Sequence, residues 1–528
     1  MPASSFALLI PIFVLLVGAL AVLLFGRLMG PRRSGFLASL IAGGALLSLL
    51  LLVGRLPSSF VLSHWRPLMG GNLTCKIDSS VLLFAITIVL LGLASILSSL
   101  DGGMEANFYV ALLVLPAAGL GFVFSANLIT LCFGWIFLEI ALLLGEMVGV
   151  GGRSPAGRMA QALGVFALLA AALLAGCGLS LDSPLPSRAL LLVALAGLLR
   201  VGIYPLRFWE PDEVRPQALP YLISTGTGLY LLICFGPSGR FLVGLGLLAF
   251  LMGAVLAWIK GGSLYFIAAS QVGYAVLTAA VARPVAPAIN LLLCLGLLFN
   301  RGKSEEKPWQ RAPLALALAS LAGLPFTLGF VGYWLLLYVF HYSLIFLIPC
   351  LLAEVSLSAA LFKIWFSPCP SERSPRASLG TSQLAEESAL SCADRGVRER
   401  PTPISPVAHL ASSVFLATPL LLFGLFPSLI REEVLPAPFR SMSISLWAAL
   451  LLPPLGGYLL YRWRRVPSWL STRLAAVFEL GWFYDALNWF LAKVEAILLG
   501  MAKVLEGEGY LGWALLAVLL ALLFLWSR

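Results

Sequence analysis

The chain has 528 residues, of which 60% are hydrophobic and 11% charged, and its formal net charge is +10. Soluble globular proteins carry about 25% charged residues, so this composition and the mean hydropathy of +0.98 exclude a soluble protein and predict an all-α polytopic membrane protein. The positive charge requires no nucleic acid partner, because Lys and Arg accumulate in the cytoplasmic loops of membrane proteins.

The apolar segments are long enough to cross a lipid bilayer, which takes about 20 residues of helix. We predict about sixteen spans by this length criterion, the segment at Val285–Phe299 being the shortest. In chain order they are Phe6–Gly26, Gly35–Val53, Ser79–Leu100, Asn107–Phe124, Leu128–Val148, Met159–Gly178, Ala189–Leu206, Gln217–Phe235, Phe241–Ile259, Ser263–Val281, Val285–Phe299, Leu314–Leu337, Ser343–Phe366, Val407–Leu429, Ile444–Tyr461 and Leu511–Trp526.

The distribution of positive residues predicts the orientation of these spans. With the N-terminus outside, alternate loops place most Lys and Arg residues inside, including the cluster RWRR at 462–465, as the positive-inside rule requires. The first span is not expected to be a cleaved signal peptide, because no basic residue precedes it and Arg27 directly follows it.

Two regions are not predicted to span the membrane. Residues 367–405 are rich in Ser, Pro, Glu and Arg, which is typical of a flexible loop; it is either a tolerated cytoplasmic insertion or a docking site for a partner. Residues 462–510 place apolar residues at helical spacing among charged ones, which predicts an amphipathic helix lying along the membrane. A further tilted span is the alternative for this second region.

No motif predicts a cofactor, a metal ion or a catalytic residue in this chain. There is no HExxH sequence, and the eight cysteines form no CxxC pair, so neither a zinc site nor a disulfide framework is indicated. The three histidines, His64, His341 and His409, fall near span ends, where interfacial positions explain them.

Ionisable residues inside the spans are rare, and such residues are functional candidates by default. Glu139 is followed by Glu146 two turns along the same helix face, Arg200 is in a later span, and Glu354 is in the middle of another. Glu139 and Arg200 are the obvious candidate pair, since opposite charges keep each other ionised in lipid. The pair is either a proton or cation relay or only a contact between packed helices.

The stretch LPFTLGFVGYWLLLYVF at 324–340 contains helix-breaking residues in an apolar span, with Pro325 and Gly329 at the predicted break. A second break is predicted between Pro205 and Pro216. Broken membrane helices usually line an ion or substrate path.

Several motifs occur in an order that resembles one family. Four segments are similar to signatures of the antiporter-like membrane subunits of respiratory complex I, Mrp antiporters and membrane-bound hydrogenases. They are the run RVGIYPLRFWEPDEVRPQALPYLISTGTGLYLL around Arg200, the segment FLEIALLL with Glu139, the segment FIAASQVGYAVL with Gly273 and Tyr274, and the broken segment with Leu324, Pro325 and Phe330. Asp78 matches an Asp that opens the third helix in the family. The resemblance is clearest from Asp78 to Phe366.

The resemblance implies about 14 core transmembrane helices with two inverted repeats of five helices, other membrane subunits as partners and an energy-transducing inner or plasma membrane. It also implies these divisions: N-terminal transmembrane helices at 1–106, an antiporter-like core at 107–366, the flexible loop at 367–405, further helices at 406–461, and a lateral segment with the last span at 462–528.

The chain departs from the family at several places. Arg207 replaces a His, and the segment INLLLCLGLLF lacks the His or Lys usually found there. Arg200 replaces a Lys, Tyr333 replaces the Lys or Glu of the twelfth helix, and Ser224 or Thr225 replaces a Lys or His of the eighth. Unlike Lys, Arg effectively cannot release its proton.

The function predicted is proton or sodium translocation as a subunit of a complex I-like NADH-quinone oxidoreductase or a related complex, with Glu139, Arg200, Tyr333, Glu354, Glu146 and Ser224 as candidates for the ion path. The alternatives are a degenerate, non-conducting scaffold subunit of such a complex and a stand-alone secondary transporter.

Overall fold

The structure is a computed structural model that describes residues 6–63, 73–100, 104–148, 155–175, 186–204, 218–235, 239–282, 284–299, 311–340, 343–366, 406–426 and 444–462, together with Arg473, Ala486, Trp489 and Lys493. The predicted loop at 367–405, the last span at Leu511–Trp526 and nearly all of the lateral segment at 462–510 lie outside these residues. The chain divides into two compact units, Met1–Arg465 and Val466–Arg528, and the first contains all the helices given below.

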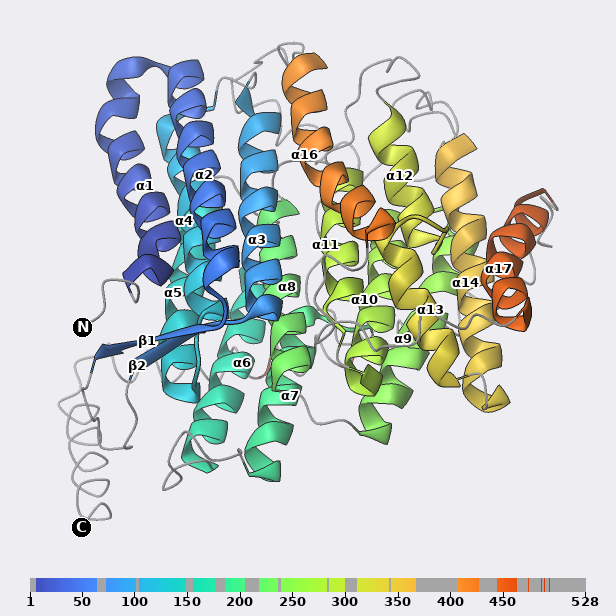
Figure 1. Ribbon diagram of the computed structural model, residues 1–528. Coiled ribbons are helices and arrows are strands. Elements are labelled where there is room, and N and C mark those ends of the chain that lie inside the picture. The colour runs from blue at the N-terminus through green and yellow to red at the C-terminus, as the bar shows by residue number, and fades with distance from the viewer. Residues whose placement is uncertain are drawn as a thin grey trace. The chain divides into compact units, whose positions relative to one another are not determined.

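Sixteen α-helices occur in the described part of the chain, and each predicted span there corresponds to one of them or, for Leu314–Leu337, to two (Figure 1). Nine of these described helices are long and apolar enough to cross a membrane, and five shorter apolar helices accompany them. The helices are α1 (Ile10–Met29), α2 (Pro31–Leu52), α3 (Ser79–Ser98), α4 (Ala106–Val123), α5 (Leu128–Met147), α6 (Pro155–Ala175), α7 (Ser187–Val201), α8 (Leu219–Cys234), α9 (Arg240–Ile259), α10 (Leu264–Ala282), α11 (Ala286–Phe299), α12 (Ala312–Leu321), α13 (Leu328–Phe340), α14 (Leu344–Phe366), α16 (Pro406–Leu425) and α17 (Ile444–Arg462).

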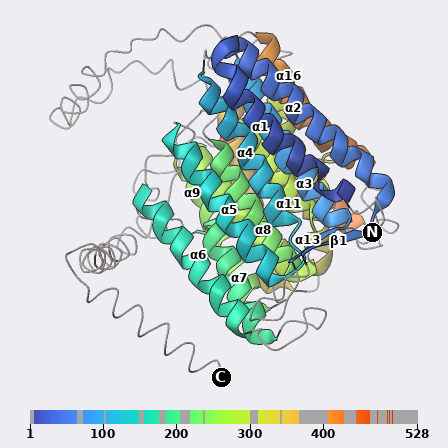
Figure 2. The ribbon, with the colours of Figure 1, turned by 90° about the vertical axis from the view of Figure 1, so that its left-hand side faces the viewer.

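The helices of the first unit form two groups that meet side by side. Figure 1 shows α1 to α8 in one group and α9 to α14 with α17 in the other, and Figure 2 shows how α5, α6, α7 and α8 run next to one another. Helices α3 and α8 contact α11, and α16 contacts both α3 and the helices α11 to α13. The core lies along this junction, where every residue of α11 is buried.

A short β-hairpin departs from the all-α prediction. Strands β1 (Ser58–Ser63) and β2 (Leu73–Ile77) pair antiparallel with Phe60 opposite Cys75. The hairpin is attached to the start of α5, since Asn127 Nδ2 donates to Thr74 Oγ1 (2.6 Å) and Lys76 N donates to Phe124 O (2.8 Å). This segment is too short and too polar to form a span, so its backbone groups are satisfied by a ladder outside the apolar helices.

Asp78 begins α3 as an N-cap, its carboxylate accepting a hydrogen bond from Val81 N at 2.9 Å. This explains why an Asp stands at the position that the family resemblance singled out. A side chain that accepts from a free N–H at a helix start stabilises that helix.

The break in the stretch 324–340 is present in the structure. Helix α12 ends at Leu321 and α13 begins at Leu328, with Gly323 and Phe326 between them at φ +63° and +66°. Helix α7 ends at Val201, where Gly202 adopts a left-handed conformation. Pro205 and Pro216, the predicted residues of that second break, lie outside the described residues.

Candidate intramembrane ion site

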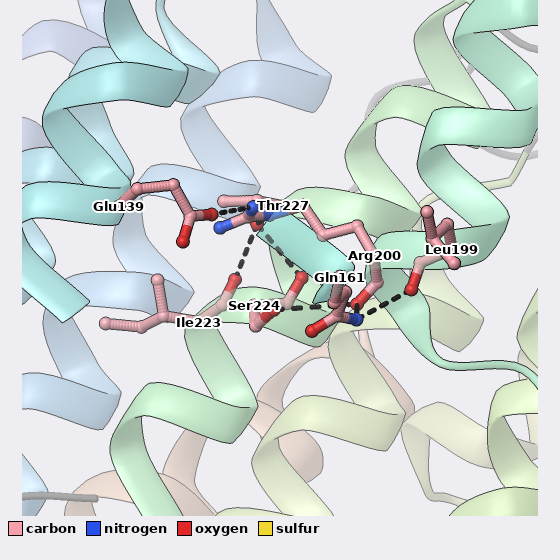
Figure 3. A network of polar contacts seen from close by, with 7 residues as sticks. All are labelled: Glu139, Gln161, Leu199, Arg200, Ile223, Ser224 and Thr227. Carbon is pink, nitrogen blue, oxygen red and sulfur yellow. Dashed lines mark hydrogen bonds and ion pairs between the residues drawn. The ribbon is translucent and has the colours of Figure 1, made fainter. Parts of the chain in front are cut away.

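Glu139 on α5 and Arg200 on α7 form an ion pair between Oε1 and Nη1, as the sequence predicts (Figure 3). The Arg200 side chain is 2% exposed and that of Glu139 is 13% exposed. A buried ion pair is strongly disrupted when one partner is removed, because the other charge is then left without compensation. The two groups therefore depend on each other for a stable charged state.

Hydrogen bonds from three helices hold Arg200 in place. Its Nε donates to Thr227 Oγ1 of α8 at 3.0 Å, and Gln161 Nε2 of α6 donates to the carbonyls of Leu199 (2.6 Å) and Arg200 (3.0 Å), as Figure 3 shows. The guanidinium lies 5.8 Å from the centroid of the Phe122 ring, within the range of a cation–π contact. Sequence reasoning missed Gln161, Thr227 and Phe122, because only the fold brings these separate segments together.

Close packing of α7 on α8 makes this geometry possible. A Cβ on Gly228 would lie 2.6 Å from Val201 Cγ2 and 2.8 Å from Val201 N, so only glycine fits there. Ser224 and Thr227 lie on the same stretch of α8, and Ser224 Oγ is 3.5 Å from the carbonyl oxygen of Arg200. The candidate Ser224 thus belongs to the Glu139–Arg200 cluster.

Glu146 lies two turns beyond Glu139 on α5 and is half-buried. The carboxylate that pairs with Arg200 is that of Glu139, so Glu146 serves as the matched comparison for Glu139 on the same helix.

The other two candidates, Tyr333 and Glu354, lie in the second group of helices. Tyr333 on α13 is 1% exposed and Glu354 on α14 is 2% exposed. Tyr274 on α10 is 3% exposed and interacts electrostatically with both of them. Sequence reasoning had singled out Tyr274 only as part of a family motif; its proximity to Glu354 depends on the packing of α10 against α13 and α14.

A polar contact spans the break between α12 and α13. Ser320 Oγ donates to Asn290 Oδ1 of α11 at 2.6 Å and accepts from Gly329 N at 3.0 Å. A Cβ on Gly329 would lie 1.7 Å from the carbonyl oxygen of Ser320, so glycine is required at this candidate position. Gly323 lies against Tyr333, its Cβ position being 3.3 Å from the Tyr333 Cβ; the break and Tyr333 are therefore adjacent.

The described residues contain no group of three or more His, Cys, Asp or Glu side chains that could hold a metal ion. The predicted residues thus fall into two clusters. One joins Glu139, Arg200 and Ser224; the other brings Tyr333 and Glu354 within electrostatic range next to the break at Pro325 and Gly329.

No family model matches the chain. Among curated proteins, the chain is similar to NADH-quinone oxidoreductase subunit N from Desulforudis audaxviator (strain MP104C), with 27% identity over 402 residues that cover 62% of this chain and 78% of the relative. The subunit N of Geobacter metallireducens (strain ATCC 53774 / DSM 7210 / GS-15) is also 27% identical, over 387 residues that cover 61% of this chain and 80% of the relative.

Solved structures share the fold. A chain of the Mrp complex from Dietzia sp. DQ12-45-1b matches with a TM-score of 0.70 and 18% identity, over 98% of this chain and 62% of that one. A chain of respiratory complex I from Thermus thermophilus matches with a TM-score of 0.56 and 20% identity, over 80% of this chain and 98% of that one.

Proposed function

We propose that this chain, a member of the antiporter-like family of membrane subunits, translocates protons or sodium ions as one subunit of a complex I-like NADH-quinone oxidoreductase or an Mrp-type assembly. The observation that carries the proposal is the Glu139–Arg200 ion pair, which joins α5 to the end of α7 in a fold shared with such subunits. Burying an ion pair inside a membrane costs much desolvation free energy. Charged residues that are kept there despite this cost usually belong to functional sites.

The proposed path uses the candidates of both clusters. In the first group of helices, the path would use Glu139, Arg200 and Ser224. In the second group it would use Tyr333 and Glu354, and Pro325 and Gly329 would form the break between α12 and α13. Helices α8, α10 and α11 contact one another between the two clusters, and their buried polar side chains include Thr225, Gln271 and Asn290. Glu146 would be peripheral to this path.

A second candidate function is a scaffold subunit that conducts nothing. The observation favouring it is that Arg200 stands where the family has a Lys, which could release a proton. In addition, Tyr333 replaces a Lys or Glu, and Ser224 or Thr225 replaces a Lys or His. The fold and the partners would be the same under both proposals, so only transport separates them.

The membrane and the orientation belong to the same proposal. We place the chain in an energy-transducing inner or plasma membrane with the N-terminus outside, because this orientation puts most Lys and Arg residues inside.

The test begins with purification of the native complex through a tag on this chain and mass spectrometry of what accompanies it. We expect subunits of a quinone-reducing complex or of an Mrp-type assembly. Recovery of the chain alone would contradict the subunit proposal and favour a stand-alone secondary transporter.

The purified complex is then reconstituted in vesicles, and proton and sodium flux are measured for the wild type, Glu139→Gln and Glu146→Gln. We expect flux in the wild type, a loss of at least tenfold in Glu139→Gln and little change in Glu146→Gln. An intact complex without flux would identify a scaffold. Equal, small effects of both variants would remove the Glu139–Arg200 pair from the path.

A further inference from the structure

Three buried polar side chains from three helices gather in the second group of helices. They are Tyr274 of α10, Tyr333 of α13 and Glu354 of α14, with exposures of 3%, 1% and 2%. Each of the three helices contacts the other two. We call these residues the Glu354 cluster.

The Tyr274 hydroxyl lies close to the backbone of α13 at Gly332, the residue before Tyr333. A Cβ on Gly332 would lie 2.6 Å from the Tyr274 hydroxyl, so this hydroxyl occupies the space beside α13 that the glycine leaves open, one residue before Tyr333. Glu354 interacts electrostatically with Tyr274, with Tyr333 and with Cys350, one turn earlier on α14, and the two phenols interact with each other. The three groups thus act on one another across the helix junction.

The cluster has unused hydrogen-bonding capacity. The hydroxyls of Tyr274 and Tyr333 and the Oε2 atom of Glu354 have no hydrogen-bond partner in the described part of the chain. Buried polar groups of this kind are rare in folded proteins and mark sites where something other than packing is required. Two phenol hydroxyls beside one carboxyl are the donors and acceptors that a mobile proton needs.

Charge distinguishes this cluster from the Glu139–Arg200 pair. The titratable groups that interact with Glu354 are Tyr274, Tyr333 and Cys350, and no described Lys or Arg forms an ion pair with it. The nearest cation on its own helix is Lys363, nine residues away or about 13 Å along α14, and its Nζ donates to Trp258 O at 2.6 Å. Helix α9 has Arg240 at its first position, and α17 has Arg462 at its last.

Burial without a cation favours the neutral form of a carboxyl group. Glu354 is therefore able to exchange a proton, whereas an arginine side chain effectively cannot. A phenol that donates to the carboxylate would stabilise the deprotonated form of Glu354. In the protonated form, the carboxyl O–H could donate to a phenol oxygen.

We propose that Glu354, with Tyr274 and Tyr333, is a reversible proton-binding site in the second group of helices. In the step, the Glu354 carboxylate takes up one proton from a hydronium ion, which becomes water, and later returns that proton to a water molecule. The inference rests on the proposed function.

Infrared difference spectroscopy on the purified complex tests this site without requiring transport. Spectra are recorded between low and high pH, and the C=O stretch of protonated carboxyl groups is followed. We expect a wild-type band that disappears in Glu354→Gln, moves in Glu354→Asp, and remains in Glu146→Gln. Removing a hydroxyl in Tyr333→Phe or Tyr274→Phe is expected to shift the band, because the polar surroundings of the carboxyl change.

The possible outcomes distinguish proton binding from sodium binding, and ion binding from ion transport. A spectrum unchanged by Glu354→Gln, measured on a complex whose Glu354→Asp variant is intact, would overturn the proposal. A wild-type band that vanishes on addition of sodium chloride at fixed pH, by a response absent in Glu354→Gln, would identify sodium binding and also overturn it. A Glu354 band in a complex without flux would keep the proton site and refute transport instead.

Discussion

The two clusters of buried ionisable residues differ in how their charge is compensated. Arg200 has Glu139 as a counter-ion and Thr227 as an acceptor, whereas Glu354 has two phenols as neighbours and no ion-pair partner among the described residues. Removing one partner of a buried ion pair leaves the other charge uncompensated, whereas a buried carboxyl without a cation favours its neutral form. Under the proposal, the second cluster is the one that binds and releases a proton.

The helix ends beside the two clusters also differ in structure. Helix α7 ends at Val201 and is followed by Gly202; α8 packs closely against this end through Gly228, and Gln161 donates to the carbonyl of Arg200. Helices α12 and α13 instead stop and restart around Ser320, whose hydroxyl connects Asn290 and Gly329. The break between α12 and α13 is held by this side-chain contact together with hydrogen bonds of its own, such as Leu324 N to Ala319 O at 3.0 Å.

The largest expected effect is on the compensated pair. Arg200→Met leaves the Glu139 carboxylate without its partner and is expected to destabilise the chain by about 3–5 kcal/mol, as for other broken buried pairs. The yield and thermal unfolding of the assembled complex measure this.

The matched control is the double variant Glu139→Gln with Arg200→Met, which removes both charges. It is expected to be more stable than Arg200→Met alone, because no isolated charge remains. A double variant less stable than Arg200→Met would show that the pair is not the source of the loss.

An intermediate effect is expected at the second break. Gly329→Ala places a Cβ 1.7 Å from the Ser320 carbonyl oxygen, and overpacking of this kind costs about 1–3 kcal/mol or more. Thermal unfolding of the purified complex provides the measurement.

Gly244 in α9 is the control, because nothing lies within 4 Å of its Cβ position. Gly244→Ala is expected to be neutral or slightly stabilising, since alanine favours helix. Equal melting temperatures for the two variants would contradict the close approach of Gly329 to the Ser320 carbonyl oxygen.

The smallest effect on stability is expected in the Glu354 cluster. Tyr333→Phe removes a hydroxyl that has no hydrogen-bond partner in the described residues, so the free energy of unfolding should change little. Tyr109→Phe is the contrast, because the buried Tyr109 hydroxyl donates to Ser99 O at 3.0 Å and its removal should cost about 1 kcal/mol.

Chemical denaturation of the two variants in detergent compares them directly. A larger loss in Tyr333→Phe than in Tyr109→Phe would assign a structural role to the Tyr333 hydroxyl.

Much of the helical framework could be predicted because apolar length determines where helices cross a membrane. The pairing of Glu139 with Arg200 was also predictable, since few charges occur in the spans and opposite ones attract. The hairpin at Ser58–Ile77 was missed because short polar strands have no strong periodic signal. Tyr274 and Gln161 were missed as site residues because their roles arise from contacts between helices, which one sequence does not display.

The measurement that tests the central contrast most directly is proton flux through the purified complex in vesicles, driven by the reaction of its co-purified partners or by an imposed ion gradient. Wild type, Glu354→Gln and Glu146→Gln are compared at equal content of this chain and of its partners. The contrast between a fixed pair and a proton-loading carboxyl predicts that Glu354→Gln loses at least tenfold of the flux and that Glu146→Gln retains it. Wild-type flux in Glu354→Gln would contradict the assignment of the proton to the second group of helices.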